Sequence, residues 1–270
     1  MPHVTAHGVD IPVLGFGTWD VHGESAYRSV RAALEVGYRH VDTAQSYRNE
    51  TQVGRAIVDS GVDRDDVFLV TKVATANAAP VDVDTSTQES LSRLGVDHVD
   101  LLLVHWPSDR APIEATVEAL DEQRQKGRTR LIGVSNYPSA LLRRALAVAP
   151  VATNQVEHHV LLGQAAVQRV LAEHGLPLTA YSPLARGVPF DRPELVEIAE
   201  AHGRTPAQVA LRWLLQRPGR IAIPRSENPE HIAANFDVLD FELSDEQMRR
   251  LDALPKDQRL VDPPFAPAWD

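Results

Sequence analysis

The sequence predicts an α/β protein with the (β/α)₈ (TIM) barrel fold. Short apolar runs that end in polar residues alternate with amphipathic helical segments along 270 residues, and this alternation over this length is typical of the fold. Runs such as Val67–Val70 and Leu101–Val104 are apolar at every position, as expected for parallel strands covered on both faces. The predicted strands are 13–17, 38–42, 67–72, 99–105, 131–135, 151–155, 177–182 and 220–224.

An open, doubly wound sheet is the alternative fold. Its first strand is normally followed by Gly-x-Gly-x-x-Gly, and the segment Gly15–Asp20 lacks the third glycine. Residues 3–12 are predicted to form an N-terminal β-hairpin, and the proline-rich segment 261–269 is predicted to be a C-terminal tail that crosses the barrel. No linker or low-complexity segment interrupts the pattern, so residues 1–270 are predicted to form a single domain.

Residues typical of helix ends support the alternation. Thr205 and Pro206 are an N-cap residue and a first-turn proline, and Ser244 with Gln247 is predicted to form a capping box. Gly95 follows an apolar helix face and predicts a C-terminus.

The composition excludes several classes of function. A formal net charge of −10, without a cluster of Lys and Arg, argues against nucleic-acid binding. Because the chain has no cysteine, disulfides, thiolate metal sites and a cysteine nucleophile are excluded. The N-terminus does not resemble a secretory signal and no apolar run is long enough for a membrane helix, which predicts a cytoplasmic protein.

Chemically useful side chains follow the predicted strands, at the ends that meet on one face of a barrel. Tyr47 follows shortly after Asp42, in the loop before the next helix. Any one of these residues has an ordinary structural explanation, such as a helix cap for Asp42 or a core position for His105. Together they predict a functional site. The strand-end residues are Asp42, Lys72, His105, Ser135, Asn136, Gln155, Tyr181, Ser182, Arg225 and Ser226.

These residue types predict proton donation to a carbonyl oxygen. A free phenol has a pKa near 10, and a Lys72 ammonium beside Tyr47 is expected to lower the pKa of Tyr47. Asp42 is expected to keep Lys72 charged, and His105 to hydrogen-bond the substrate oxygen. No side chain can deliver hydride, so this chemistry implies a nicotinamide cofactor.

Asp42, Tyr47, Lys72 and His105 match, in order and context, the tetrad of the aldo-keto reductases, and the chain resembles that family from end to end. Within the family it is most similar to bacterial 2,5-diketo-D-gluconate and methylglyoxal reductases. The resemblance implies NADPH-dependent reduction of aldehydes and ketones, with a small keto-sugar acid or 2-oxoaldehyde as substrate. The protein is predicted to be a monomer. The other segments that carry it are Leu14–Trp19, Val134–Tyr137, Asn154–Glu157 and Ala180–Leu184.

The same resemblance implies a role for each matching residue. Tyr47 would be the general acid, Lys72 and Asp42 would tune it, and His105 would orient the carbonyl. The implied cofactor-binding residues are Thr18, Trp19, Asp42, Ser135, Asn136, Gln155, Tyr181, Ser182, Leu184, Arg225, Ser226, His231 and Asn235. The implied substrate-binding residues are Trp19, Tyr47, His105 and Trp106, with Phe265 or Trp269 as further candidates from the tail.

The sequence departs from the family pattern after the last strand. The family commonly has Ile-Pro-Lys-Ser there and an arginine a few residues later, to hold the phosphate on the adenosine ribose. This chain has Arg225 and Ser226, with His231 at the later position. An arginine still binds phosphate, but a neutral histidine is a weaker partner. NADPH is therefore the expected cofactor, and NADH is the second candidate.

The residues leave two alternatives to a carbonyl reductase open. Lys72 could form a Schiff base, as in an aldolase, or the barrel could bind a dinucleotide mainly to regulate a partner. Glu157-His158-His159 resembles a metal-binding group, but neighbours on a strand point to opposite faces and no third ligand is suitably spaced. No metal site is predicted.

Overall fold

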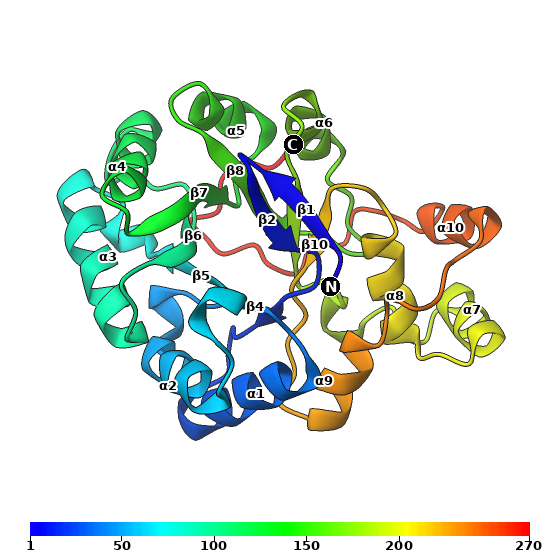
Figure 1. Cartoon of the computed structure of the whole chain (residues 1–270). Helices are drawn as coiled ribbons and strands as arrows, with labels where there is room; N and C mark the ends of the chain where they lie inside the picture. Colours follow the sequence, from blue (N-terminus) through cyan, green and yellow to red (C-terminus); the bar gives the residue numbers. More distant parts are fainter.

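The computed structural model describes residues 1–270 and shows a barrel of parallel strands surrounded by helices (Figure 1). The eight strands are arranged in sequence order. This order confirms the predicted (β/α)₈ class, whereas in a doubly wound sheet the strand order reverses. The barrel strands are β3 (Phe16–Gly17), β4 (His40–Asp42), β5 (Phe68–Val73), β6 (Val99–Val104), β7 (Thr129–Ser135), β8 (Val151–Glu157), β9 (Leu178–Tyr181) and β10 (Arg220–Ala222).

The barrel closes between its first and last strands. Leu14 forms a parallel bridge with Ala222, and the amide of Gly17 donates to the carbonyl oxygen of Pro224 at 3.0 Å. A Cβ atom at Gly17 would lie 2.8 Å from the carbonyl oxygen of Ile223. Glycine therefore permits the close approach that closes the barrel.

Helices cover the outside of the barrel, and apolar side chains between helices and strands form the main core. The two predicted N-caps are confirmed, because Thr205 and Ser244 both form complete capping boxes. Gly95, with φ of 68°, ends its helix as predicted. The helices are α1 (Gly23–Val36), α2 (Glu50–Ser60), α3 (Pro80–Leu94), α4 (Ile113–Gln125), α5 (Ser139–Leu146), α6 (Ala165–Glu173), α7 (Pro193–His202), α8 (Pro206–Leu215), α9 (Pro229–Phe236) and α10 (Asp245–Asp252).

An N-terminal hairpin covers the amino end of the barrel. Its strands, β1 (His3–Ala6) and β2 (Val9–Pro12), pair antiparallel as predicted. Ile11 is fully buried in a second apolar cluster with barrel side chains such as Leu103. The hairpin lies at the front of Figure 1, so the carboxyl ends of the strands open on the far side.

The C-terminal tail crosses that carboxyl end, behind the hairpin in Figure 1. The Glu157 carboxylate, at the end of β8, accepts hydrogen bonds from the amides of Leu260 and Val261 at 2.8 and 2.9 Å. Further along, the ring of Phe265 packs edge-on against Trp106, with 5.5 Å between centroids. The tail therefore packs against the open end of the barrel at Glu157 and Trp106.

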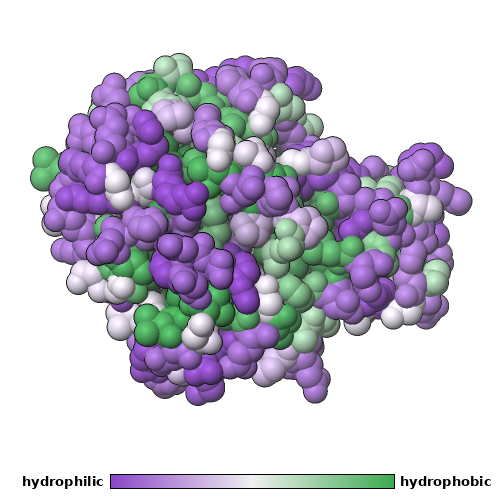
Figure 2. All heavy atoms as spheres, viewed as in Figure 1, coloured by the Kyte–Doolittle hydropathy of each residue, from purple (hydrophilic) through white to green (hydrophobic).

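The predicted strands are all present, and only their ends differ. For example, the strand predicted at 38–42 begins at His40, because the amide of Tyr38 still donates to the carbonyl oxygen of Ala33 in α1 at 3.0 Å. No helix is long and apolar enough to span a membrane. The face that carries the hairpin mixes hydrophilic and hydrophobic residues (Figure 2).

Candidate active site

A cavity of about 570 Å³ opens at the carboxyl end of the strands. It brings together most of the residues predicted from the strand ends and loops. Lys72 lies beneath it, fully buried. Thr18, Ser226, His231 and Asn235 are outside its lining, and so are the tail candidates Phe265 and Trp269. The predicted residues that line it are Trp19, Asp42, Tyr47, His105, Trp106, Ser135, Asn136, Gln155, Tyr181, Ser182, Leu184 and Arg225.

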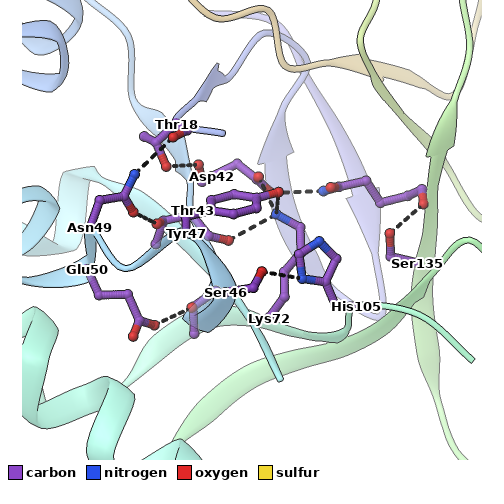
Figure 3. A network of polar contacts seen from close by, with 12 residues as sticks. Thr18, Asp42, Thr43, Ser46, Tyr47, Asn49, Glu50, Lys72, His105 and Ser135 are labelled. Atoms are coloured by element: carbon purple, nitrogen blue, oxygen red, sulfur yellow. Dashed lines mark hydrogen bonds and ion pairs between the residues drawn. The ribbon is translucent and has the colours of Figure 1, made fainter. Parts of the chain in front are cut away.

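Lys72, Asp42 and Tyr47 meet at the bottom of this cavity (Figure 3). The Lys72 ammonium, from β5, contacts the Asp42 carboxylate from the end of β4 and donates to the carbonyl oxygen of Thr43 at 2.9 Å. Its Nζ also lies 3.4 Å from the Tyr47 hydroxyl oxygen. Because β4 and β5 pair in parallel, the sheet itself brings these two strand ends together.

The pKa of Tyr47 is raised, which corrects the expectation that Lys72 would lower it. Burial disfavours the charged phenolate, and the nearby Asp42 carboxylate adds to the shift in the pKa of Tyr47. Burial also lowers the pKa of Lys72, an effect that Asp42 opposes without cancelling. The site therefore holds Tyr47 as a neutral phenol that still carries its proton.

The imidazole of His105 lies against Tyr47, with 5.4 Å between ring centroids. Burial, followed by the charge of Lys72, lowers the pKa of His105 to about 3, so the ring is neutral at pH 7. Its Nδ1 lies 3.1 Å from the hydroxyl oxygen of Ser46 (Figure 3). A hydroxyl that donates to Nδ1 leaves the ring hydrogen on Nε2, where it can be donated to a substrate oxygen.

Asn49 ties together the loops that carry the site. Its amide nitrogen donates to the carbonyl oxygens of Thr18 and Val21, both at 2.9 Å. Its amide oxygen accepts from the hydroxyl of Thr43 at 2.7 Å. This fully buried side chain therefore holds the segment that contains Trp19 against the end of β4.

Ser135, Asn136, Gln155 and Tyr181 form another wall of the cavity. The Tyr181 hydroxyl donates to the Asn136 oxygen at 2.8 Å, and the Asn136 nitrogen donates to the Ser135 hydroxyl at 3.0 Å. Gln155 donates one amide hydrogen to Asp42 at 2.8 Å. Its second amide hydrogen and its oxygen remain for a ligand, and these groups suit the carboxamide of a nicotinamide. The residues present therefore fit a nicotinamide dinucleotide.

Backbone strain also marks this cavity. Only seven non-glycine residues in the chain have positive φ, and four of them line the cavity: Asp20 (56°), Asn136 (63°), Ser182 (46°) and Arg186 (53°). A left-handed conformation costs about 1–3 kcal/mol at such a residue. Residues in this conformation are concentrated at functional sites. The concentration of strain points to a ligand site independently of the residue types.

The predicted cofactor residues outside the lining differ in their surroundings. Thr18 is buried, and its hydroxyl donates to the carbonyl oxygen of Asp42 at 3.0 Å, which braces the ends of β3 and β4. Ser226 and His231 lie beyond Arg225, before and on α9, and His231 is exposed. Asn235 is buried on the inner side of α9.

Several lining residues were not predicted from the sequence. Three of them, Gly17, Ile223 and Pro224, lie beside the barrel closure. The others come from loops or from the tail, whose paths the strand pattern does not determine. In the sequence, the only signal for Asp20 and Arg186 is that they lie next to segments that resemble the family. In the structure, the Arg186 guanidinium lies over the Trp19 ring, 5.1 Å from its centroid. The residues missed are Gly17, Asp20, Pro183, Arg186, Gly187, Phe190, Ile223, Pro224 and Val261.

Glu157, His158 and His159 do not converge on one point. The buried Glu157 carboxylate holds the tail and contacts the His159 ring at 3.0 Å, whereas His158 bonds the carbonyl oxygen of Leu162 at 2.8 Å. The group therefore anchors the tail and the loop after β8.

Comparison with known proteins agrees with this geometry. Residues 13–256 match the model of the aldo/keto reductase family. An aldo-keto reductase of Mycolicibacterium smegmatis is 44% identical over 264 residues, which are 96% of this chain and 95% of that protein. A solved structure provisionally assigned as a 2,5-diketo-D-gluconic acid reductase B superposes with a TM-score of 0.97 at 43% identity, covering 99% of this chain and 97% of that one. Aldose reductase from Schistosoma japonicum superposes with a TM-score of 0.92 at 32% identity, covering 97% and 94%.

The fold and the residues gathered in its cavity define a barrel oxidoreductase. The chain belongs to the aldo/keto reductase family. Membership of this family implies NAD(P)H-dependent reduction of carbonyl compounds.

Proposed function

We propose that this protein reduces aldehydes and ketones to alcohols, with hydride from a nicotinamide dinucleotide and a proton from Tyr47. The observation that supports this most is the position of the Tyr47 hydroxyl, 3.4 Å from the Nζ of Lys72 in a cavity that His105 also lines. A neutral phenol there carries its proton at pH 7 and can donate it to a substrate oxygen.

Each residue of the tetrad has a separate task in this proposal. The Tyr47 hydroxyl and the Nε2–H of His105 donate hydrogen bonds to the carbonyl oxygen and polarise the bond to its carbon. The reduced oxygen is a stronger base than a phenolate and takes the proton from Tyr47. The Lys72 ammonium stabilises the phenolate that remains, and Asp42 keeps that ammonium in place.

A bound nicotinamide dinucleotide would supply the hydride. Ser135, Asn136 and Gln155 would hold its carboxamide, and the Tyr181 ring would lie against the nicotinamide. The resemblance favours NADPH over NADH. The remaining residues proposed to contact the cofactor are Thr18, Trp19, Asp42, Ser182, Leu184, Arg225, Ser226, His231 and Asn235.

The proposed substrate is a small keto-sugar acid or 2-oxoaldehyde. One similar structure carries a provisional assignment as a 2,5-diketo-D-gluconic acid reductase, and the rings of Trp19 and Trp106 line a cavity of modest size here. We also propose that residues 1–270 form one domain, which acts as a monomer in the cytoplasm.

The surroundings of Lys72 do not favour the Schiff-base alternative. Its side chain is fully buried, and Nζ is engaged by the Asp42 carboxylate and the Thr43 carbonyl. A Schiff-base lysine needs a free amine that a substrate can reach.

Assays of NADPH and NADH oxidation with methylglyoxal, diketogluconate and nitrobenzaldehyde test the proposed function. Turnover with identified alcohol products supports it. Tight dinucleotide binding without turnover of any carbonyl would support a regulatory module instead, and borohydride trapping of a substrate on Lys72 would support an aldolase.

A further inference from the structure

Arg225, at one end of the cavity, lies between two carboxylates, of which Asp20 lines the cavity and Glu227 does not. Arg225 Nη2 lies 3.7 Å from Asp20 Oδ2, and its Nη1 lies 3.4 Å from Glu227 Oε1. Glu227 also accepts a hydrogen bond from the Ser25 hydroxyl of α1, which holds its carboxylate beside the arginine. These two carboxylates offset the charge of Arg225, and the other guanidinium of the lining, that of Arg186, lies over the Trp19 ring at 5.1 Å. A phosphate held by Arg225 would therefore meet negative charge directly beside that guanidinium.

The neighbouring polar groups are already engaged within the loop. The Ser226 hydroxyl accepts from the Asn228 amide at 3.1 Å and lies 3.4 Å from the Asn228 carbonyl oxygen. The Asn228 side chain accepts from the amide of Glu230 at 2.8 Å and so caps α9. A helix N-terminus can bind a phosphate through its free amides, but at α9 Pro229 has no amide hydrogen and the amide of Glu230 is already bonded to the Asn228 side chain.

We propose that Glu227 is a specificity-determining residue that makes this enzyme favour NADH over NADPH. The inference rests on the proposed function, because it takes the adenosine ribose of the dinucleotide to lie at the Arg225 end of the cavity. NADH has a free 2′-hydroxyl on that ribose, and a carboxylate accepts hydrogen bonds from ribose hydroxyls. NADPH carries a phosphate dianion there. Asp20 and Glu227 repel this phosphate and compete with it for the Arg225 guanidinium.

Dissociation constants for NADH and NADPH test this inference without relying on turnover. They can be measured on the full chain by quenching of tryptophan fluorescence, for the wild type and for Glu227→Gln, which keeps the size of the side chain and removes its charge. Glu230→Gln is the matched control, because Glu230 is an exposed carboxylate close by, in the first turn of α9, and forms no ion pair.

The wild type is expected to bind NADH more tightly than NADPH. Glu227→Gln should lower the dissociation constant for NADPH about tenfold, equivalent to about 1.4 kcal/mol. Its dissociation constant for NADH should be equal to that of the wild type or higher. Glu230→Gln should change either constant by less than about twofold.

A wild type that binds NADPH more tightly than NADH overturns the inference and leaves the proposed function standing. The same holds if Glu227→Gln leaves the ratio of the two dissociation constants unchanged. If neither dinucleotide binds, the proposed function fails and this inference fails with it.

Discussion

The Lys72 ammonium is fully buried, and its hydrogen-bond partners are the Asp42 carboxylate, the Thr43 carbonyl and the Tyr47 hydroxyl. A buried charge that loses its partner costs far more than the intact pair contributes. The contact between Lys72 and Asp42 therefore has two effects at the level of single residues. It holds the ammonium beside Tyr47, and it keeps the buried Asp42 carboxylate from being unpaired.

Lys72→Met is expected to lower the free energy of unfolding by about 3 kcal/mol, because it leaves the charge of Asp42 buried and unpaired. The double variant Asp42→Asn/Lys72→Met should recover part of that loss, since the buried charge is removed as well. Urea unfolding of both variants at neutral pH measures the difference. A single variant as stable as the wild type would contradict the assigned pair.

Ser46→Ala is expected to lower kcat about two- to tenfold, because the hydrogen bond that keeps the His105 ring hydrogen on Nε2 contributes roughly 0.5–1.5 kcal/mol. Nitrogen-15 NMR of the imidazole distinguishes the two neutral forms. The Nε2–H form should dominate in the wild type and lose population in Ser46→Ala, and Ser46→Thr, which keeps a hydroxyl, is the control. A wild type with the hydrogen on Nδ1 would refute this role of Ser46.

At the scale of elements, β8 serves both the cavity and the tail. Residues two apart on a strand share a face, so Gln155 reaches Asp42 in the cavity while Glu157 holds the amides of Leu260 and Val261. The strand therefore sets the position of the tail relative to the site.

Glu157→Gln is expected to raise KM for the carbonyl substrate and to lower stability by about 1–2 kcal/mol, because an amide side chain cannot accept from both backbone N–H groups of the tail. Kinetics and limited proteolysis of the tail measure the two effects. Glu173→Gln, which removes an exposed pair with Arg143, should behave as the wild type. If KM and protease resistance stay unchanged, the aromatic contacts of the tail hold it instead.

Elements that are locally encoded could be predicted from the sequence. The β5 and β6 strands are buried at every position and carry the apolar runs Phe68–Val70 and Leu101–Val104, because helices cover them outside and the barrel interior covers them inside. The cap at Thr205 needs only neighbouring residues. The closure beside Gly17 depends on strands far apart in the chain. Its position therefore could not be predicted from a local pattern.

The same limit applies to the site. Strand-end residues such as Asp42 and Gln155 were predictable because a barrel brings strand ends together, whereas Asp20 and Arg186 depend on the paths of loops. The pKa of Tyr47 was predicted in the wrong direction, because residue type reveals a charged neighbour but not how deeply a phenol is buried.

At the scale of the whole molecule, buried histidines couple stability to pH. Burial lowers the pKa of His40, and it lowers the pKa of His105 and His158 to about 3. A histidine in the unfolded chain titrates near 6.5. Between about pH 6.5 and 3 the unfolded chain therefore binds protons that the native chain does not, and the free energy of unfolding falls as the pH falls.

The free energy of unfolding is expected to drop by roughly 2–5 kcal/mol between pH 7 and about pH 4.5. His158→Gln should flatten this dependence, because it removes one buried histidine outside the cavity, whereas His231→Gln at an exposed position should not. Urea unfolding across the pH range gives the slopes. Equal slopes in the wild type and His158→Gln would contradict the assignment.

The most direct test of Tyr47 as the proton donor is the rate of carbonyl reduction by Tyr47→Phe at saturating dinucleotide. We predict a loss of at least about 10²-fold, the usual contribution of a general acid, with the dissociation constant of the dinucleotide nearly unchanged. A Tyr47→Phe enzyme that turns over at a rate close to that of the wild type would contradict the central claim.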